Sequence, residues 1–135
     1  MPKTPVLECI DCIRISVPDL ESGLKFYRDQ LGHKVLWRMQ NYIGLKMPVS
    51  QTEIVLDTHP HAPEVFIKVK DVKEAVKSIL AGGGSVTVSP YEIEVGFCAS
   101  IRDPWGNGFV LMDTSKGLLT TDPEGNVTGV SREIK

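Results

Sequence analysis

Residues 13–32 read IRISVPDLESGLKFYRDQLG, and this stretch decides the fold. Its first five residues alternate apolar with polar side chains, which predicts a β-strand with one buried face. Asp19 can then cap a helix, and Gly32 can end it in the left-handed conformation. Between them, apolar residues recur at helical spacing, namely Leu20, Leu24, Tyr27 and Leu31. We therefore expect a strand followed by a helix over residues 19–31.

The same arrangement returns in residues 65–84, which read VFIKVKDVKEAVKSILAGGG. An alternating segment is again followed by an aspartate, Asp71, and Glu74 stands three positions later, as in a capping box. The expected buried side of the helix consists of Val72, Ala75, Val76, Ile79 and Leu80. The pattern predicts a second strand and a helix over 71–81 that ends at three glycines.

Further β-rich segments follow each helix, so the chain is expected to hold two βαβββ modules, at 8–58 and 63–114. The predicted segments are Val35–Arg38, Tyr42–Met47, Glu53–Thr58, Ser85–Val88, Glu92–Ile101 and Gly108–Thr114. Two short matches support a duplication, Val17-x-Asp19 with Val69-x-Asp71 and Asp57-Thr58 with Asp113-Thr114. We expect one domain over residues 1–135 with fold class α+β.

Two Asp-Pro-x-Gly-Asn segments, at 103–107 and 122–126, have the residues that a type I turn favours. The first predicts a hairpin between the last two strands of the second module. The second lies in residues 115–135, which we expect to form a small hairpin outside the modules. This hairpin could serve in assembly or in partner binding, so that the protein surface and not a cavity would carry the function.

The composition excludes several classes of protein. The 15 Lys and Arg residues nearly balance 17 Asp and Glu, which disfavours binding to nucleic acid or to an anionic membrane. No apolar run approaches the roughly 20 residues that span a bilayer, and no signal-type apolar core follows Met1. The three cysteines, Cys9, Cys12 and Cys98, form no CxxC motif. We expect a cytoplasmic protein with free thiols.

The element order, together with residues 17–21 (VPDLE), 24–32 (LKFYRDQLG) and 103–107 (DPWGN), resembles the vicinal oxygen chelate superfamily. That group includes glyoxalase I, the bleomycin-resistance proteins, fosfomycin-modifying enzymes and extradiol dioxygenases. The resemblance spans about residues 8–114. It implies two modules that form a curved mixed sheet around a cavity, and by analogy with the bleomycin-resistance branch it implies a homodimer.

The resemblance also implies four cavity positions that hold a metal ion in the enzymes of the superfamily. In this chain they fall on Cys12, on Leu56 or Ile54, on Glu64 and on Val110. One thiol and one carboxylate fall short of the three protein ligands that a catalytic zinc ion normally takes. We therefore expect no metal, no cofactor and a site that departs from the enzyme pattern.

Strand alternation then predicts which side chains line the concave face. The polar and mixed positions of the two opening strands are Cys12, Arg14, Ser16, Glu64, Phe66 and Lys68. An apolar lining would come from Ile54, Leu56, Val110 and Met112, and Trp37 could stack on a planar ligand. These residues predict a metal-free protein that binds a small, partly aromatic molecule, as in drug or metabolite binding.

Several alternatives stay open at this point. Arg14 and Lys68 could anchor a carboxylate or phosphate, or Arg14 could simply pair with Glu64. Cys12 could be a nucleophile or a buried apolar filler, and His59 with His61 could bind a metal or lie in an exposed linker. A different class is a metal-dependent lyase, isomerase or dioxygenase. It would use Glu64, Cys12 and residues displaced by a one-residue slip, such as Glu53, Asp57 or Glu94.

Overall fold

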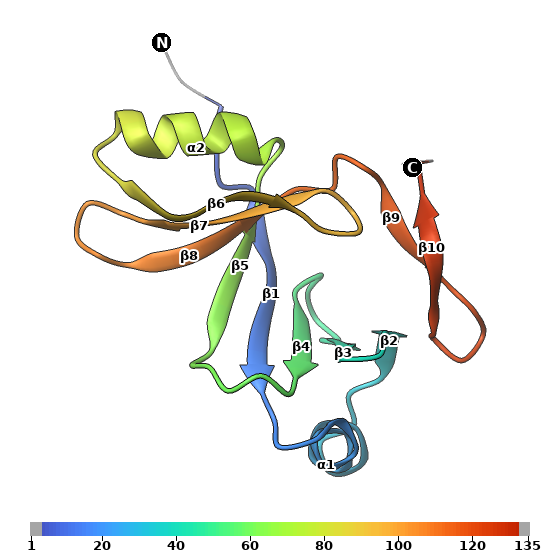
Figure 1. Ribbon diagram of the computed structural model, residues 1–135. Coiled ribbons are helices and arrows are strands. Elements are labelled where there is room, and N and C mark those ends of the chain that lie inside the picture. Colours follow the sequence, from blue (N-terminus) through green and yellow to red (C-terminus); the bar gives the residue numbers. More distant parts are fainter. Residues whose placement is uncertain (1–3, 133–135) are drawn as a thin grey trace. The chain divides into compact units, whose positions relative to one another are not determined.

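The structure, a computed structural model, describes residues 4–132, so the ends of the predicted domain and tail lie outside the described residues (Figure 1). The chain divides into two compact units. The first unit comprises Asp11–Val65 and Thr120–Gly129, and the second comprises Phe66–Leu119 with the segments at the chain ends. Their strands and helices follow the βαβββ order twice, which confirms the α+β fold class. Among the described residues, no helix has the length and apolar character needed to cross a membrane.

The first unit holds β1, a short helix pair and three further strands. Their bounds are β1 Cys9–Ser16, α1 Leu20–Leu24, η1 Lys25–Gln30, β2 Val35–Arg38, β3 Tyr42–Lys46 and β4 Glu53–Asp57. The strands lie in the order β2-β3-β4-β1, with β1 parallel to β4 and the other neighbours antiparallel. The core of the unit consists of Leu24, Ile43, Leu45 and Leu56, all fully buried. Leu24 comes from α1, so the helix covers one face of this sheet.

The helix starts where the sequence predicts but changes type halfway. The Asp19 carboxylate accepts a hydrogen bond from the Ser22 amide at 2.8 Å, which confirms the cap. From Lys25 onward the chain forms a π-helix, in which the Leu31 amide donates to the Phe26 carbonyl five residues back. The wider turn rotates later residues away from the core. Leu31 is consequently 51% exposed, and its predicted place in the buried stripe is wrong.

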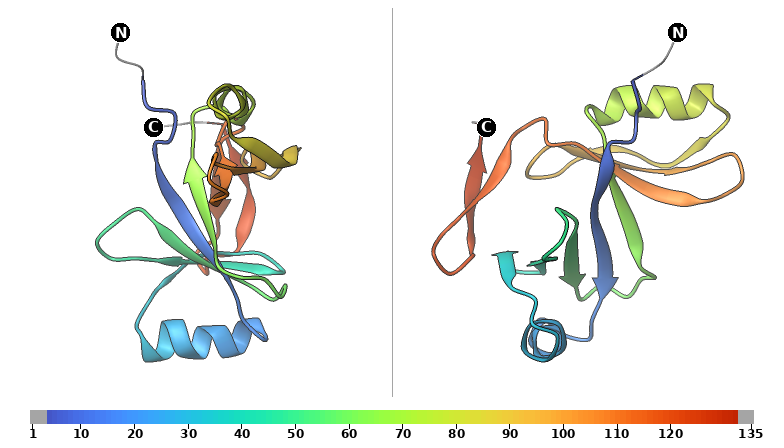
Figure 2. Two further views of the ribbon diagram at one scale, coloured as in Figure 1. Left: turned by 90° about the vertical axis from the view of Figure 1, so that its left-hand side faces the viewer. Right: turned by 180° about the vertical axis from the view of Figure 1, so that it is seen from behind.

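The second unit repeats the order with one longer helix, α2, which lies along its strands (Figure 2). The bounds are β5 Glu64–Lys68, α2 Val72–Ala81, β6 Ser85–Glu92, β7 Phe97–Arg102 and β8 Gly108–Met112, in the sheet order β5-β8-β7-β6. The first two residues of β5, Glu64 and Val65, belong to the first unit. Asp71 caps α2 through the Glu74 amide, as predicted. Val72, Ala75 and Val76 are buried, whereas Leu80 is 53% exposed and does not belong to the buried side.

The strand boundary between β6 and β7 differs from the prediction. β6 runs on to Glu92, and bulges on either side of Val88 accommodate the strand that contains Pro90. The break falls instead at residues 93–96, where Ile93 and Gly96 exchange backbone hydrogen bonds of 2.9 and 3.3 Å. The predicted strand Glu92–Ile101 is therefore a turn followed by a strand.

The tail forms the expected hairpin from β9 Leu118–Thr121 and β10 Val127–Ser131. Asp122 closes its turn by accepting a hydrogen bond from the Asn126 amide at 2.9 Å. The turn belongs to the first unit and contacts β2 there, because the Arg38 amide donates to the Gly125 carbonyl at 2.8 Å. The hairpin tip thus extends the edge of the first sheet.

The two modules share one strand register, and this register shows that a predicted sequence match is off by one residue. In the first, the Val17 amide donates to the Asp57 carbonyl, and in the second the equivalent Val69 amide donates to the Met112 carbonyl. Asp57 therefore corresponds to Met112 and not to Asp113. The match between Asp57-Thr58 and Asp113-Thr114 does not reflect structural equivalence, and the second aspartate instead bonds the start of α2.

Candidate functional site

The candidate site lies on the face of the first sheet opposite the core. We call it the Arg14 face and define it by the residues that share its side of the strands. Paired positions of neighbouring strands point to the same side, so the register fixes this set. Residues that pair across neighbouring strands form rows on this face. The rows are Cys12 with Glu53; Arg14 with Val55, Gly44 and Trp37; and Ser16 with Asp57 and Tyr42.

Two of the predicted lining residues lie on the opposite side. Leu56 belongs to the buried core under α1, and Ile54 packs against the same core. Leu56 pairs with Ile15, which also packs there, so both side chains point toward the helix. The expectation that they share a face with Arg14 is wrong by one residue. The neighbours Glu53, Val55 and Asp57 occupy the Arg14 face instead.

Arg14 is the centre of a charged cluster. Its Nη2 donates to Glu64 Oε1 at 2.7 Å, and its Nε lies 3.0 Å from Asp57 Oδ2. The guanidinium carbon also lies 5.9 Å from the centre of the Tyr42 ring, a cation–π distance. The pairing of Arg14 with Glu64 is confirmed. An anionic ligand would have to displace this carboxylate from the guanidinium.

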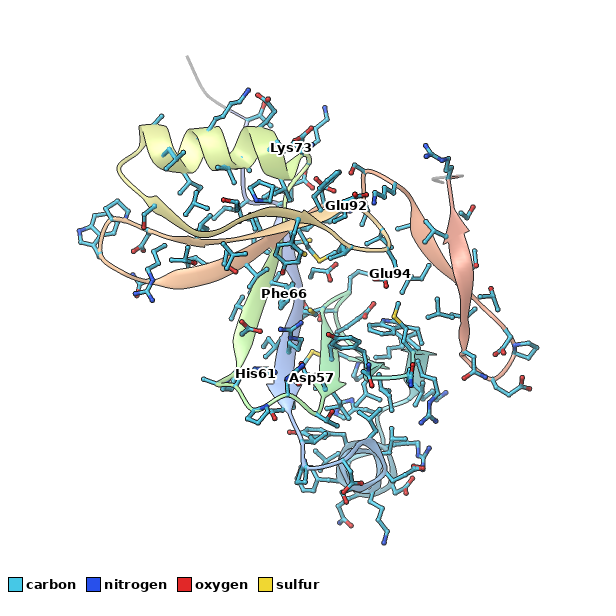
Figure 3. The ribbon with its side chains drawn as sticks, in the orientation of Figure 1. Asp57, His61, Phe66, Lys73, Glu92 and Glu94 are labelled. Carbon is cyan, nitrogen blue, oxygen red and sulfur yellow. The ribbon has the colours of Figure 1, made fainter. Side chains whose placement is uncertain are left out.

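His61 adds a second cation to the same cluster (Figure 3). Its Nε2 lies 2.9 Å from both carboxylate oxygens of Asp57, and its Nδ1 lies 2.7 Å from the Ala62 carbonyl. Acceptors at both ring nitrogens favour the doubly protonated ring. The Ala62 carbonyl is the largest cause that raises the pKa of His61, and Asp57 adds to the effect.

This environment predicts a pH dependence of stability. The pKa of His61 is raised above its usual 6.5 in the folded state. The protonated ring therefore contributes its full share to the free energy of unfolding below pH 6.5. This share is lost as the pH rises through the folded-state pKa. We expect the free energy of unfolding to fall over this range, and the fall to be smaller in His61→Gln. Urea denaturation between pH 5.5 and 8.5 measures it, with the exposed His59→Gln as control; equal slopes in all three proteins would contradict the assignment.

Trp37 and Glu53 form a second contact on this face. The Trp37 indole Nε1 donates to Glu53 Oε1 at 2.7 Å. A methyl group at Gly44 would lie 2.1 Å from the same Nε1, so the ring lies directly over the glycine. Burial is the main cause that raises the pKa of Glu53, although the Trp37 hydrogen bond opposes it. The face therefore offers a flat aromatic surface and a partly buried carboxyl group.

Cys12 shares a row with Glu53 and is only 5% exposed. A buried thiol is shielded from reagents in solution. We expect iodoacetamide near neutral pH to label Cys12 no faster than Cys98, which is also buried, while the exposed Cys9 reacts first. Peptide mass spectrometry resolves the three sites. Selective rapid labelling of Cys12 would restore the nucleophile hypothesis.

The remaining predicted residues lie in the second unit. Phe66 pairs with Val110 and Lys68 pairs with Met112, so all four share one face of that sheet, as alternation predicts. Cys98, opposite Met112, shares it too. Whether they contact a ligand remains a prediction.

The donor set on the Arg14 face does not fit a divalent metal ion. The two carboxylates that approach each other, Asp57 and Glu64, already contact the guanidinium between them. Both nitrogens of His61 face oxygen atoms, which also argues against the proposed pair of histidine ligands. Within residues 4–132, no cluster of three or more His, Cys, Asp or Glu side chains is suited to a metal.

An open hollow of about 390 Å³ lies elsewhere in the first unit, beside the hairpin tip. It is lined by Arg38, Met39, Gln40, Asn126 and Val127, none of which was predicted to bind a ligand. The sequence interpretation also missed the role of Tyr42. No local pattern marks that residue, because its contact with Arg14 depends on the pairing of three strands.

Comparison with known proteins identifies the family. The sequence model of the Glyoxalase/Bleomycin resistance protein/Dioxygenase superfamily matches residues 9–111. The chain belongs to this superfamily. Its match covers both βαβββ modules and leaves the C-terminal hairpin outside. No curated protein matches this chain at a significant level.

Solved structures share the superfamily fold at low sequence identity. Methylmalonyl-CoA epimerase from Mycobacterium tuberculosis is 18% identical with a TM-score of 0.70, over 84% of this chain and 92% of that one. A variant of the Streptomyces coelicolor epimerase, in complex with 2-nitronate-propionyl-CoA, is 19% identical with a TM-score of 0.67, over 81% and 99%. A variant of homoprotocatechuate 2,3-dioxygenase from B. fuscum is 19% identical with a TM-score of 0.53, over 94% and 34%.

Proposed function

We propose that this superfamily member binds a small, partly aromatic molecule on the Arg14 face without a metal ion. The observation that carries the proposal is the charge-balanced cluster of Arg14, Asp57, Glu64 and His61 beside two half-buried aromatic rings, Trp37 and Tyr42. Planar surfaces with a few fixed polar groups are typical of sites for small organic ligands.

The charges of the cluster determine which kind of ligand is favoured. Arg14 is engaged by two carboxylates, whereas the Glu64 side chain is 36% exposed and retains free acceptor capacity. A cationic or amide-rich aromatic molecule can donate to Glu64 without breaking an existing ion pair. An aromatic acid would have to compete with it. The proposal therefore favours amide-bearing or cationic ligands such as peptide antibiotics.

Isothermal titration with a panel of peptide antibiotics, aromatic amides and aromatic acids tests this preference. We expect amide or cationic members to bind, and Glu64→Gln to weaken them about tenfold through loss of a charge-assisted hydrogen bond. Glu74→Gln, at an exposed position on α2, is the matched control. A panel in which only acids bind, or in which both variants behave alike, would contradict the proposal.

A second candidate is an enzyme that moves a proton with Glu53. The raised pKa of this carboxyl group, caused mainly by burial, favours it, because a proton-transfer group works best with a pKa near the working pH. The structural neighbours include methylmalonyl-CoA epimerases. Deuterium incorporation into methylmalonyl-CoA in D₂O that disappears in Glu53→Gln would establish this activity. Absence of incorporation would leave the binding function.

We also propose a cytoplasmic homodimer, from the sequence resemblance and from exposed apolar residues of the hairpin. Leu118 is 45% exposed and Val130 is 37% exposed. Light scattering on the full chain measures the mass directly. Truncation after Ser115 shows whether the hairpin contributes, since an unchanged number of protomers per particle would remove it from the interface.

A further inference from the structure

We propose that the second unit carries a binding site for a phosphate group, formed by Lys73 and Lys116 at the ring of Phe97. The Lys73 Nζ lies 4.4 Å from the ring centre and the Lys116 Nζ lies 5.3 Å from it. The two ammonium groups come from the start of α2 and from the turn after β8. The site contains no residue of the Arg14 face and does not depend on the function proposed for it.

One buried carboxylate holds the three segments of this site together. Asp113, only 2% exposed, accepts hydrogen bonds from the Val72 amide at 2.8 Å, the Phe97 amide at 3.0 Å and the Ser115 hydroxyl at 2.7 Å. Val72 precedes Lys73, and Ser115 precedes Lys116. The backbone positions that carry both lysines and the ring are therefore fixed before any ligand binds, which lowers the entropic cost of binding.

A glycine makes this arrangement possible. A Cβ atom at Gly96 would lie 2.2 Å from Asp113 Oδ1 and 2.5 Å from its carbonyl oxygen, so no larger residue fits there. The hydrogen bonds also keep Asp113 charged: burial alone would raise its pKa, but the bonds from Val72, Ser115 and Phe97 lower it on balance. A stable anion inside the fold supports two cations at its surface.

The solvent-facing groups of the site carry two positive charges and one negative charge, while Asp113 is buried and its oxygens already accept hydrogen bonds. Lys116 donates to Glu92, at the end of β6, and Lys73 is close enough to lower the pKa of the same carboxyl group (Figure 3). One carboxylate thus faces two ammonium groups. The aromatic face attracts both cations and offsets part of their repulsion. Glu92 is 70% exposed and can turn toward solvent when an anion arrives.

A phosphate group suits this arrangement better than a single carboxylate. It carries close to two negative charges near neutral pH and three acceptor oxygens, which matches two ammonium groups with three donors each. Its oxygens can accept charge-assisted hydrogen bonds from both lysines at once. The chemical class expected here is inorganic phosphate or a phosphate monoester.

Titration of the full chain with inorganic phosphate and with phenyl phosphate, followed by NMR at constant ionic strength, tests the site. We expect amide shifts near Phe97 that saturate, and a two- to fivefold loss of affinity, on the order of an exposed ion pair, in Lys73→Met and in Lys116→Met. Lys77→Met, on the same helix but paired with Glu74, is the control and should bind as the parent does.

Glu92→Gln provides a variant with the opposite expectation. Removing the competing carboxylate should strengthen phosphate binding, and this gain cannot arise from damage to the fold. Binding of phenyl phosphate but not of inorganic phosphate would assign the site to monoesters. Equal shifts with chloride, or equal affinities in the Lys73, Lys116 and Lys77 variants, would overturn the proposal.

Discussion

Replacing Asp57 by Asn is expected to lower the free energy of unfolding by about 3 kcal/mol, because the change removes the anion from a buried ion pair. Asp57 is 2% exposed and faces Arg14 at 3.0 Å and His61 at 2.9 Å. An amide cannot neutralise the two partly buried cations. Glu64 remains near Arg14 but is too exposed to replace the lost charge.

Urea denaturation at pH 6, where His61 carries its proton, measures this effect. Asp29→Asn is the control, since Asp29 pairs with Arg28 on the surface and is 53% exposed. Its loss should be much smaller, as for other exposed ion pairs. Equal losses in the two variants would show that the cluster on the Arg14 face does not stabilise the protein.

Leu56→Ala is expected to cost about 3 kcal/mol, the range found for a leucine removed from a packed core. The side chain is fully buried among Leu24, Ile43 and Leu45. The same substitution at Leu31, which lies 51% exposed beyond the π-helix, should cost less than about 0.5 kcal/mol.

The pair of leucine variants also tests the strand register. If Leu56 lay on the Arg14 face, its removal would leave the core intact and would change ligand binding instead. Thermal and urea denaturation of both variants distinguish these outcomes. A larger loss for Leu31→Ala than for Leu56→Ala would contradict both the register of β4 and the change of helix type.

Much of the fold follows from local signals in the sequence. Asp19 and Asp71 cap their helices as predicted, because the capping bond joins residues only three positions apart. Gly32 takes a φ of 85° and Gly106 a φ of 93°, as the predicted helix end and turn require. Each of these features depends on a few neighbouring residues.

The errors arise where several strands or turns decide the outcome together. β4 contains three consecutive aliphatic residues, Ile54, Val55 and Leu56, so alternation cannot tell its two faces apart. The match between Asp57 and Asp113 is misleading as well, because Asp57 corresponds to Met112. The π-helix likewise has no signal in the apolar spacing, which fits an ordinary helix up to Leu31.

The candidate site was predictable in part. The alternation of side chains along β1 places Arg14 and Ser16 on one face. The possible pairing of Arg14 with Glu64 follows from the expected order of the strands. The contacts of Asp57, His61 and Tyr42 with Arg14 or with one another depend on the strand register and on the path of the segment between β4 and β5. Such long-range geometry cannot be derived from one sequence without the structure.

The two tryptophans allow the most direct test of the proposed binding function. Trp37 lies on the Arg14 face and donates to Glu53, whereas Trp105 is 82% exposed at a turn of the second unit. We expect two indole N–H signals in a ¹⁵N NMR spectrum, and Trp37→Phe assigns them. Titration with an amide-bearing aromatic ligand, in protein treated with chelator, should shift the Trp37 signal to saturation and leave the Trp105 signal in place. Unchanged Trp37 signals across the panel, or shifts that require an added divalent metal, would contradict metal-free binding on this face.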